Sequence, residues 1–351
     1  MIDMSSVSFR FRWALDDEAF RITGDTKSVT LRAEPETVAT LLAPRGEQSA
    51  WQSVATVRLD ISDSQHAILS EIAGGRLPEG CDLSHDVAGN VPRWLDGQIK
   101  VLVLPVLPKT FRDFVQTQRD DLSTQARRFV DLLRWATNAR AAHNPFGVGV
   151  LEFSLDGTAW VSAPKNPPGA PVDLHVGFGI STDAFNCDVI SDLALAGQSE
   201  PVGHSLIREA LDLRAIGPRA AVVLGAAAAE TAVKETIHRL VPSATYLVDE
   251  VSSPPVVKLL SEYLPQLDPI DERFRAAFPP PKPIRRSLEW LVQTRNRVVH
   301  NREQRYWFPE LHPALMHVRD LVWLLDCYCG HDWAYGHISA EIREQLQIQR
   351  T

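Results

Sequence analysis

The sequence has few cysteines and no long apolar run. Its 351 residues include four cysteines, none of them in a Cys-x-x-Cys pair, which argues against a disulfide framework or a zinc ribbon. The first residues contain neither the basic nor the apolar segment of a signal peptide, and no later run is apolar enough for a membrane span. We therefore expect a cytoplasmic protein that does not associate with membranes.

The overall charge also excludes one class of protein. A formal net charge of -8 disfavours a surface that coats nucleic acid broadly, so any contact with RNA must be local. A hydrophobic share of 44% and a charged share of 23% are typical of a globular protein. The length is sufficient for two domains, each with its own core.

The N-terminal half, residues 1–198, is predicted to be an α+β domain. Alternation of apolar and polar residues predicts strands at 7–13 and 55–61, with further strands at 29–32, 99–106, 148–153 and 158–161. Helices are expected at 35–42, after a capping box at Ser62 and Gln65, and from about Ser123. The Asp156-Gly157 pair indicates a hairpin.

This half shows no catalytic constellation. The glycines of 177–179 lack the third glycine and the apolar helix of a phosphate-binding loop, and a plain turn explains them better. Asp183, Asp188 and Asp192 suit metal binding, but a solvated acidic loop explains them as well. Only its position suggests that this half is a sensor or targeting domain.

The C-terminal half, residues 199–351, has a helical pattern throughout. Helices are predicted at 205–213, where Ser205 is the expected cap, and at 219–241, 256–264, 284–300, 313–328 and 339–348. Gly217-Pro218 separates the first two, and the proline-rich segment 278–283 is a rigid connector.

Glu230 is unusual because it lies in an apolar, alanine-rich helix. A buried carboxylate without a cationic partner is costly, so this residue requires a positive charge nearby. Lys234, four residues later, would give an ordinary pair within the helix, whereas an arginine from another helix would join two helices.

The stretch Arg295-Asn296-Arg297-Val298-Val299-His300-Asn301 ends the helix predicted from residue 284. Three- and four-residue steps place Arg295 and Val299 on the packed stripe of this helix, whereas Asn296 and His300 share a neighbouring face. Arg286, Arg297 and Arg302 add positive charge in an otherwise acidic protein, and we expect them to contact an RNA backbone.

These residues resemble a HEPN domain (higher eukaryotes and prokaryotes nucleotide-binding), a family that includes ApeA-like proteins. The hallmark is an arginine, a polar residue and a histidine five positions after the arginine, matched by Arg295, Asn296 and His300. The resemblance covers roughly residue 203 to the C-terminus. It implies a helical bundle that dimerises with two motifs facing each other across a cleft.

The resemblance further implies a metal-independent endoribonuclease with a toxin–antitoxin or antiviral role. His300 would transfer protons, and Arg295 would stabilise charge on the phosphate. Asn296 would orient His300 or hydrogen-bond the phosphate, and Glu230 would hold Arg295 in position. No cofactor is expected. The expected partners are RNA, a second copy of the chain, and an antitoxin or regulatory protein.

Three alternatives remain open. In the first, Arg295 and Glu230 form a structural pair and His300 caps the C-terminal end of the helix. In the second, the domain is an inactive HEPN-like module that binds RNA or protein. Cys327, Cys329, His331 and His337 have the ligand types of a zinc site, although nearby tryptophans favour ordinary core packing.

Overall fold

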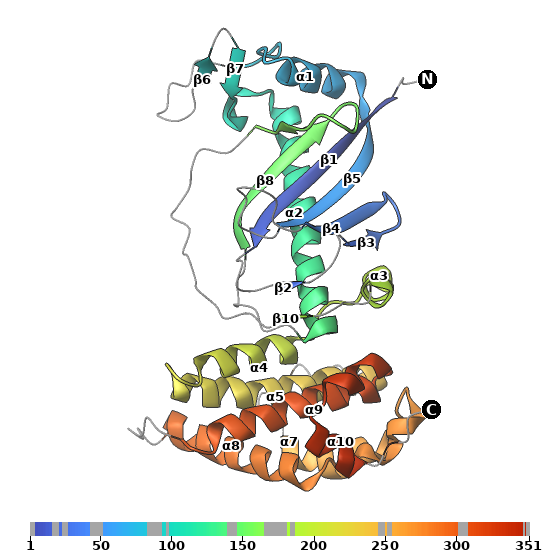
Figure 1. Ribbon diagram of the computed structural model, residues 1–351, viewed down its shortest axis with the longest axis vertical. Helices are drawn as coiled ribbons and strands as arrows, with labels where there is room; N and C mark the ends of the chain where they lie inside the picture. Colours follow the sequence, from blue (N-terminus) through green and yellow to red (C-terminus); the bar gives the residue numbers. More distant parts are fainter. Residues whose placement is uncertain are drawn as a thin grey trace. The chain divides into compact units, whose positions relative to one another are not determined.

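The computed structural model of the chain describes residues 4–15, 21–22, 27–42, 52–82, 93–95, 98–138, 146–164, 181–182, 187–244, 250, 255–300, 308–346 and 348. The chain divides into two compact units, unit 1 at residues 1–199 and unit 2 at residues 200–351. Each unit is described by itself (Figure 1).

Unit 1 is built on a six-stranded antiparallel sheet with the order β3-β4-β5-β1-β8-β9 (Figure 1). Its strands are β1 (Met4–Leu15), β3 (Lys27–Arg32), β4 (Thr37–Leu42), β5 (Gln52–Ser62), β8 (Phe146–Ser154) and β9 (Val161–Ser162). Two short pairs join β2 (Arg21–Ile22) to β10 (Ser181–Thr182) and β6 (Arg93–Leu95) to β7 (Gln98–Val101). The predicted strands at 7–13, 29–32 and 55–61 and the hairpin between β8 and β9 are confirmed.

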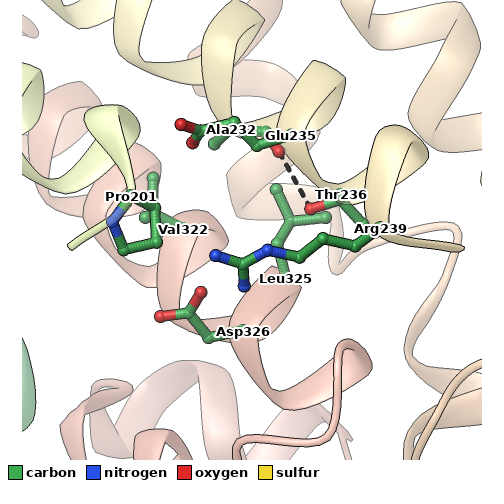
Figure 2. A pocket seen from close by; sticks show the side chains of 8 residues that line it. All are labelled: Pro201, Ala232, Glu235, Thr236, Arg239, Val322, Leu325 and Asp326. Carbon is green, nitrogen blue, oxygen red and sulfur yellow. Dashed lines mark hydrogen bonds between the residues drawn. The ribbon is translucent and has the colours of Figure 1, made fainter. Parts of the chain in front are cut away.

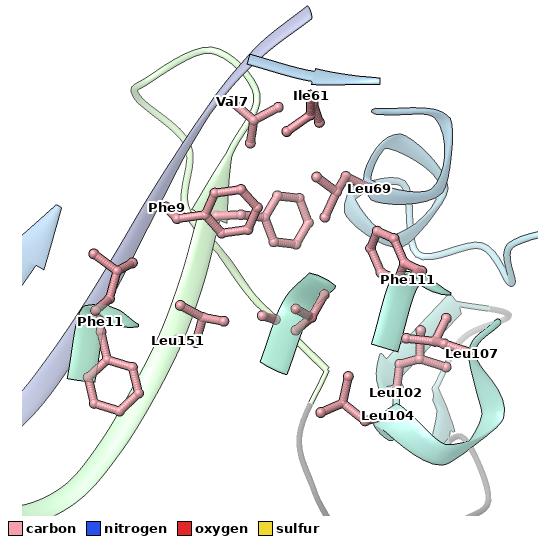
Figure 3. Close-up of a cluster of buried hydrophobic side chains, with 14 of the residues drawn as sticks. Val7, Phe9, Phe11, Ile61, Leu69, Leu102, Leu104, Leu107, Phe111 and Leu151 are labelled. Atoms are coloured by element: carbon pink, nitrogen blue, oxygen red, sulfur yellow. The ribbon is translucent and has the colours of Figure 1, made fainter. Parts of the chain in front are cut away.

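Helices cover one face of this sheet and complete its core. They are α1 (Asp63–Ala73), the short 3-10 helix η1 (Leu104–Val106), α2 (Lys109–Thr137) and α3 (Cys187–Leu195). The capping box of α1 is confirmed, since Ser62 Oγ accepts from the Gln65 amide and Gln65 Oε1 accepts from the Ser62 amide. Side chains of β1, α1, α2 and β8, including Phe9, Leu69 and Phe111, meet in one buried cluster (Figure 3).

Four predictions for unit 1 are wrong. The strand expected at 158–161 begins only at Val161. The helix expected at 35–42 is absent: residues 35 and 36 lie in a turn and Thr37–Leu42 form strand β4, because β3 and β5 pair with it on both sides and its side chains alternate between buried and half-buried. The strand expected at 99–106 ends at Val101, since Pro105 cannot donate to a ladder and lies instead in η1. The long helix begins at Lys109 rather than near Ser123, with Phe111 and Val115 already buried. The glycines of 177–179 and Asp183 lie outside the described residues.

Unit 2 is mostly helical (Figure 1). Its longer helices are α4 (Val202–Leu213), α5 (Pro218–Leu240), α8 (Lys282–His300), α9 (Leu311–Tyr328) and α10 (Ala340–Leu346). Short turns lie between them: η2 (Pro242–Ala244), α7 (Val256–Lys258), η3 (Leu259–Tyr263), η4 (Leu264–Gln266), η5 (Glu272–Ala277) and η6 (Asp332–His337). Helix α5 packs against α4, α8 and α9, and α8 packs against α9. The chain is thus an α+β unit followed by a helical unit.

Glycines allow the helices of unit 2 to approach closely. A Cβ atom at Gly203 of α4 would lie 2.9 Å from Ala232 Cβ of α5. At Gly225 of α5 it would overlap Leu315 Cδ2 of α9 and lie 3.3 Å from Leu291 Cδ2 of α8. Within the described part of the chain, no helix is long and apolar enough to cross a membrane.

Two boundaries in unit 2 differ from prediction. Helix α4 begins at Val202 after Pro201, so Ser205 lies inside the helix and does not cap it. The Glu235 carboxylate instead accepts from the amides of Val202 and Gly203, at 2.9 and 3.4 Å. Pro283 belongs to the first turn of α8 rather than to the connector, because a first-turn proline loses no helical hydrogen bond. The start of α5 at Gly217-Pro218 is confirmed.

Candidate functional site

Helix α8 carries the Arg295–His300 motif at its C-terminal end. Its buried side chains follow a stripe of three- and four-residue steps: Ile284, Leu288, Leu291, Thr294 and Val298. The prediction that Arg295 and Val299 continue this stripe is wrong. Arg295 is half-buried at the edge of the stripe, and Val299 is 53% exposed. Because burying a guanidinium is costly, the helix buries Thr294 and Val298 and turns the arginine outward.

Arg295 and Asn296 are joined at the surface of α8. Arg295 Nη1 donates to Oδ1 of Asn296 at 3.2 Å, and the asparagine side chain is exposed. This bond holds one end of the guanidinium beside a group that can itself bind a phosphate or a histidine.

Glu230 of α5 lies near enough to Arg295 to interact electrostatically. Partial burial raises the pKa of Glu230, and the positive charges of Arg295 and then Lys234 oppose this rise. Both partners considered for Glu230 therefore contribute, with Arg295 the stronger. No salt bridge between Glu230 and Arg295 is present in the described structure, so their attraction acts through space and Arg295 bonds to Asn296 instead.

The remaining motif residues are placed in part. His300 is the last residue of α8, one turn after Asn296, but its side chain and the whole of Arg302 lie outside the described residues. Arg286 and Arg297 are exposed on α8. Arg297 also donates to the buried Thr294 hydroxyl at 3.0 Å, which satisfies the polar group in the packed stripe.

Arg219 is a neighbour of the motif that the sequence analysis missed. It lies in the first turn of α5, and its Nη2 donates to the carbonyl oxygen of Val298 at 3.3 Å. The sequence does mark Arg219 as unusual, because it is a cation directly after Gly217-Pro218, in the first turn of a helix, where the helix dipole disfavours positive charge.

The residues of the zinc alternative do not form a metal centre. Cys327 and Cys329 are buried, and burial raises the pKa of the Cys329 thiol to about 11. The Trp323 ring contacts the rings of both His204 and His337, at centroid distances of 4.2 and 4.5 Å. Over the described residues, no group of three potential ligands has an arrangement suitable for a metal ion.

A second polar cluster lies between α4, α5 and α9. A pocket there is lined by Pro201, Ala232, Glu235, Thr236, Arg239, Val322, Leu325 and Asp326, and the Arg239 guanidinium extends toward Asp326 (Figure 2). His204 and Asp326, both buried, are joined by a 2.7 Å contact from Nε2 to Oδ2. Arg239 Nη1 also lies 3.4 Å from Nε2 of His331. Asp326 stands in an otherwise apolar run, the same signal that drew attention to Glu230.

The two clusters differ in what they can do. In the pocket the charged groups engage one another below the surface, which favours a structural network. At the end of α8, by contrast, exposed Asn296 and half-buried Arg295 offer hydrogen-bond donors to a ligand. A scan against protein-family models, a search of curated proteins and a search of solved structures each found no match for this chain.

Proposed function

We propose that unit 2 is a HEPN-like endoribonuclease whose site lies at the C-terminal end of α8. The observation that carries the proposal is the bond between Arg295 and exposed Asn296, which leaves the guanidinium at the surface rather than in a buried ion pair. Glu230 supports Arg295 by charge without occupying its donors. A planar guanidinium is well matched to phosphate oxygens.

The reaction proposed is attack of a ribose 2′-hydroxyl on the adjacent phosphorus. A new bond forms between the 2′-oxygen and phosphorus, the bond to the 5′-oxygen breaks, and a 2′,3′-cyclic phosphate and a 5′-hydroxyl result. His300 moves the proton, since an ordinary histidine pKa of about 6.5 allows exchange near neutral pH. Arg295 stabilises the charge that develops on the phosphorane oxygens, and Asn296 orients the reacting groups. Exposed Arg286 and Arg297 extend a basic strip for the RNA backbone.

The test uses purified full-length protein and mixed RNA in EDTA. We expect cleavage to 2′,3′-cyclic ends, and its loss in His300→Ala and Arg295→Ala. Gln293→Ala is the matched control, because Gln293 is exposed on α8 two residues before Arg295 and has no assigned role. Cleavage that survives both motif changes would refute the proposal. Retention of RNA without turnover would favour the binding-module alternative.

The proposed enzyme acts as a homodimer, in a toxin or antiviral role restrained by an antitoxin or another regulatory protein. A single motif offers one histidine, whereas cyclising transfer benefits from both an acid and a base. Exposed Val299, beside the motif, is an apolar group that a second copy could cover. Light scattering that finds only monomer at active concentrations would contradict this paired site.

A further inference from the structure

The last described turn of α8 is bonded to another helix. Helix α8 is described as far as His300, and Val298 lies in that last turn. Arg219 of α5 donates to the carbonyl oxygen of Val298, with Nη2 3.3 Å from that oxygen. The first turn of α5 is thereby attached to the last turn of α8.

The charge of Arg219 suits α8 better than its own helix. A cation in the first turn of α5 opposes the dipole of that helix, whereas the same charge at the C-terminal end of α8 is favourable. Among the described residues Arg219 makes no ion pair, and its hydrogen bond goes to Val298. Its location is therefore explained by the end of α8.

We infer that Arg219 is a positioning residue that fixes the final turn of α8 and so orients the candidate site. Its bond restrains the peptide between Val298 and Val299, which lies between Asn296 and His300 in the chain. The inference rests on the proposed function where it concerns catalysis. The restraint on the helix end can be measured without any activity.

A carbonyl cap and a phosphate clamp make different demands on this side chain. A single donor satisfies a carbonyl, so lysine can replace arginine there. A phosphate held by two parallel bonds needs the guanidinium fork, and lysine would not replace it. Arg219→Lys therefore separates positioning of the helix from direct contact with substrate.

The experiment compares Arg219→Ala, Arg219→Lys and Arg214→Ala in the full-length protein. Arg214 is the matched control, because its Nη1 donates to the Leu211 carbonyl, so it caps its own helix α4 rather than α8. Hydrogen exchange is followed at the amides of Val299 and His300, which close the last turn of α8. We expect Arg219→Ala to accelerate exchange there by roughly 5- to 10-fold, while Arg219→Lys and Arg214→Ala leave it near the wild-type rate.

Kinetics on RNA supply the second measurement. We expect Arg219→Ala to lower kcat by roughly 10- to 100-fold with little change in KM, because a misplaced group affects the reaction more than binding. Lysine should restore most of this loss. A raised KM that lysine does not restore would overturn the inference in favour of phosphate contact.

The two proposals fail separately. If the wild type cleaves RNA but Arg219→Ala leaves exchange at Val299 and His300 unchanged, the positioning inference is wrong while the proposed function stands. If the wild type cleaves no RNA, the proposed function fails, and the exchange comparison alone decides whether Arg219 fixes the end of α8.

Discussion

Gly225 provides a quantitative test of how the helices of unit 2 are held around the candidate site. It lies on α5 between Arg219 and Glu230, where the absence of a Cβ leaves room for Leu315 and Leu291. Gly225→Ala should raise the free energy of unfolding by about 1 kcal/mol, because alanine favours a helix more than glycine does. It should lose about 1–3 kcal/mol from overpacking, since the new Cβ would overlap the side chain of a fully buried Leu315. The net cost expected is about 0–2 kcal/mol.

Leu315→Ala, combined with Gly225→Ala, tests the same contact more directly. Alone, Leu315→Ala should lower the free energy of unfolding by about 2–5 kcal/mol, because it leaves a cavity in a packed core. The methyl group introduced by Gly225→Ala would partly fill that cavity, so the double variant should lose less stability than the sum of the two by about 0.5–3 kcal/mol. The free energies come from urea unfolding followed by helical circular dichroism.

Gly336 supplies the control, because a Cβ added there has no neighbour within 4 Å. Gly336→Ala should not destabilise the protein. In the double variant, its effect on the free energy of unfolding should add to that of Leu315→Ala within about 0.5 kcal/mol. If the effects of Gly225→Ala and Leu315→Ala also add within that limit, then α5 and α9 do not approach each other closely at Gly225.

Three further predictions concern polar groups that are partly or fully buried. Because burial raises the pKa of Glu230, the folded protein holds this proton more tightly than the unfolded chain, and the resulting stability is lost as pH rises through the raised pKa. Glu230→Gln should therefore raise Tm at neutral pH and flatten Tm against pH. Asp326→Ala should lower the free energy of urea unfolding by about 3–5 kcal/mol, because it removes the carboxylate that contacts buried His204. Asp332→Ala is the control, since this carboxylate is 66% exposed, and it should change the same free energy by less than about 0.5 kcal/mol. The Cys327 and Cys329 thiols should resist iodoacetamide until the protein unfolds, since burial raises the pKa of both, as mass spectrometry can show.

Each of these has a contrary result. A lower Tm for Glu230→Gln at neutral pH would mean that attraction to Arg295 outweighs the burial of the carboxylate. Equal costs for the Asp326 and Asp332 changes would contradict the buried pair with His204. Rapid alkylation of Cys327 in folded protein would contradict its burial.

Local sequence patterns predict most elements, but they do not determine the phase of α8 near its end. Steps of three or four residues from Leu291 reach Thr294 and Arg295 equally well, and periodicity alone does not choose between them. The choice follows from physical chemistry: threonine hides a hydroxyl that Arg297 satisfies, whereas arginine would lose its hydration. Applying that cost to the sequence would have turned Arg295 outward.

The partners of Arg219 and Glu230 cannot be predicted from local sequence patterns. Both depend on how α5 crosses α8, and that crossing depends on contacts far apart in the chain, such as Gly225 against Leu315. The need of Glu230 for a cation can be recognised from its apolar surroundings, but which cation lies nearer cannot. Strand β4 illustrates the same limit, because pairing on both sides overrides a helical spacing of apolar residues.

The start of unit 2 bears on how the chain can be dissected. The first amides of α4 bond to Glu235 of α5, and Glu200 pairs with Arg208 of α4 at 2.5 Å. The partners in these contacts all lie within residues 200–351. A gene fragment that begins at Glu200 would encode every one of these partners, so the helical unit could be expressed, fused to another protein or exchanged between chains with the cap of its first helix intact.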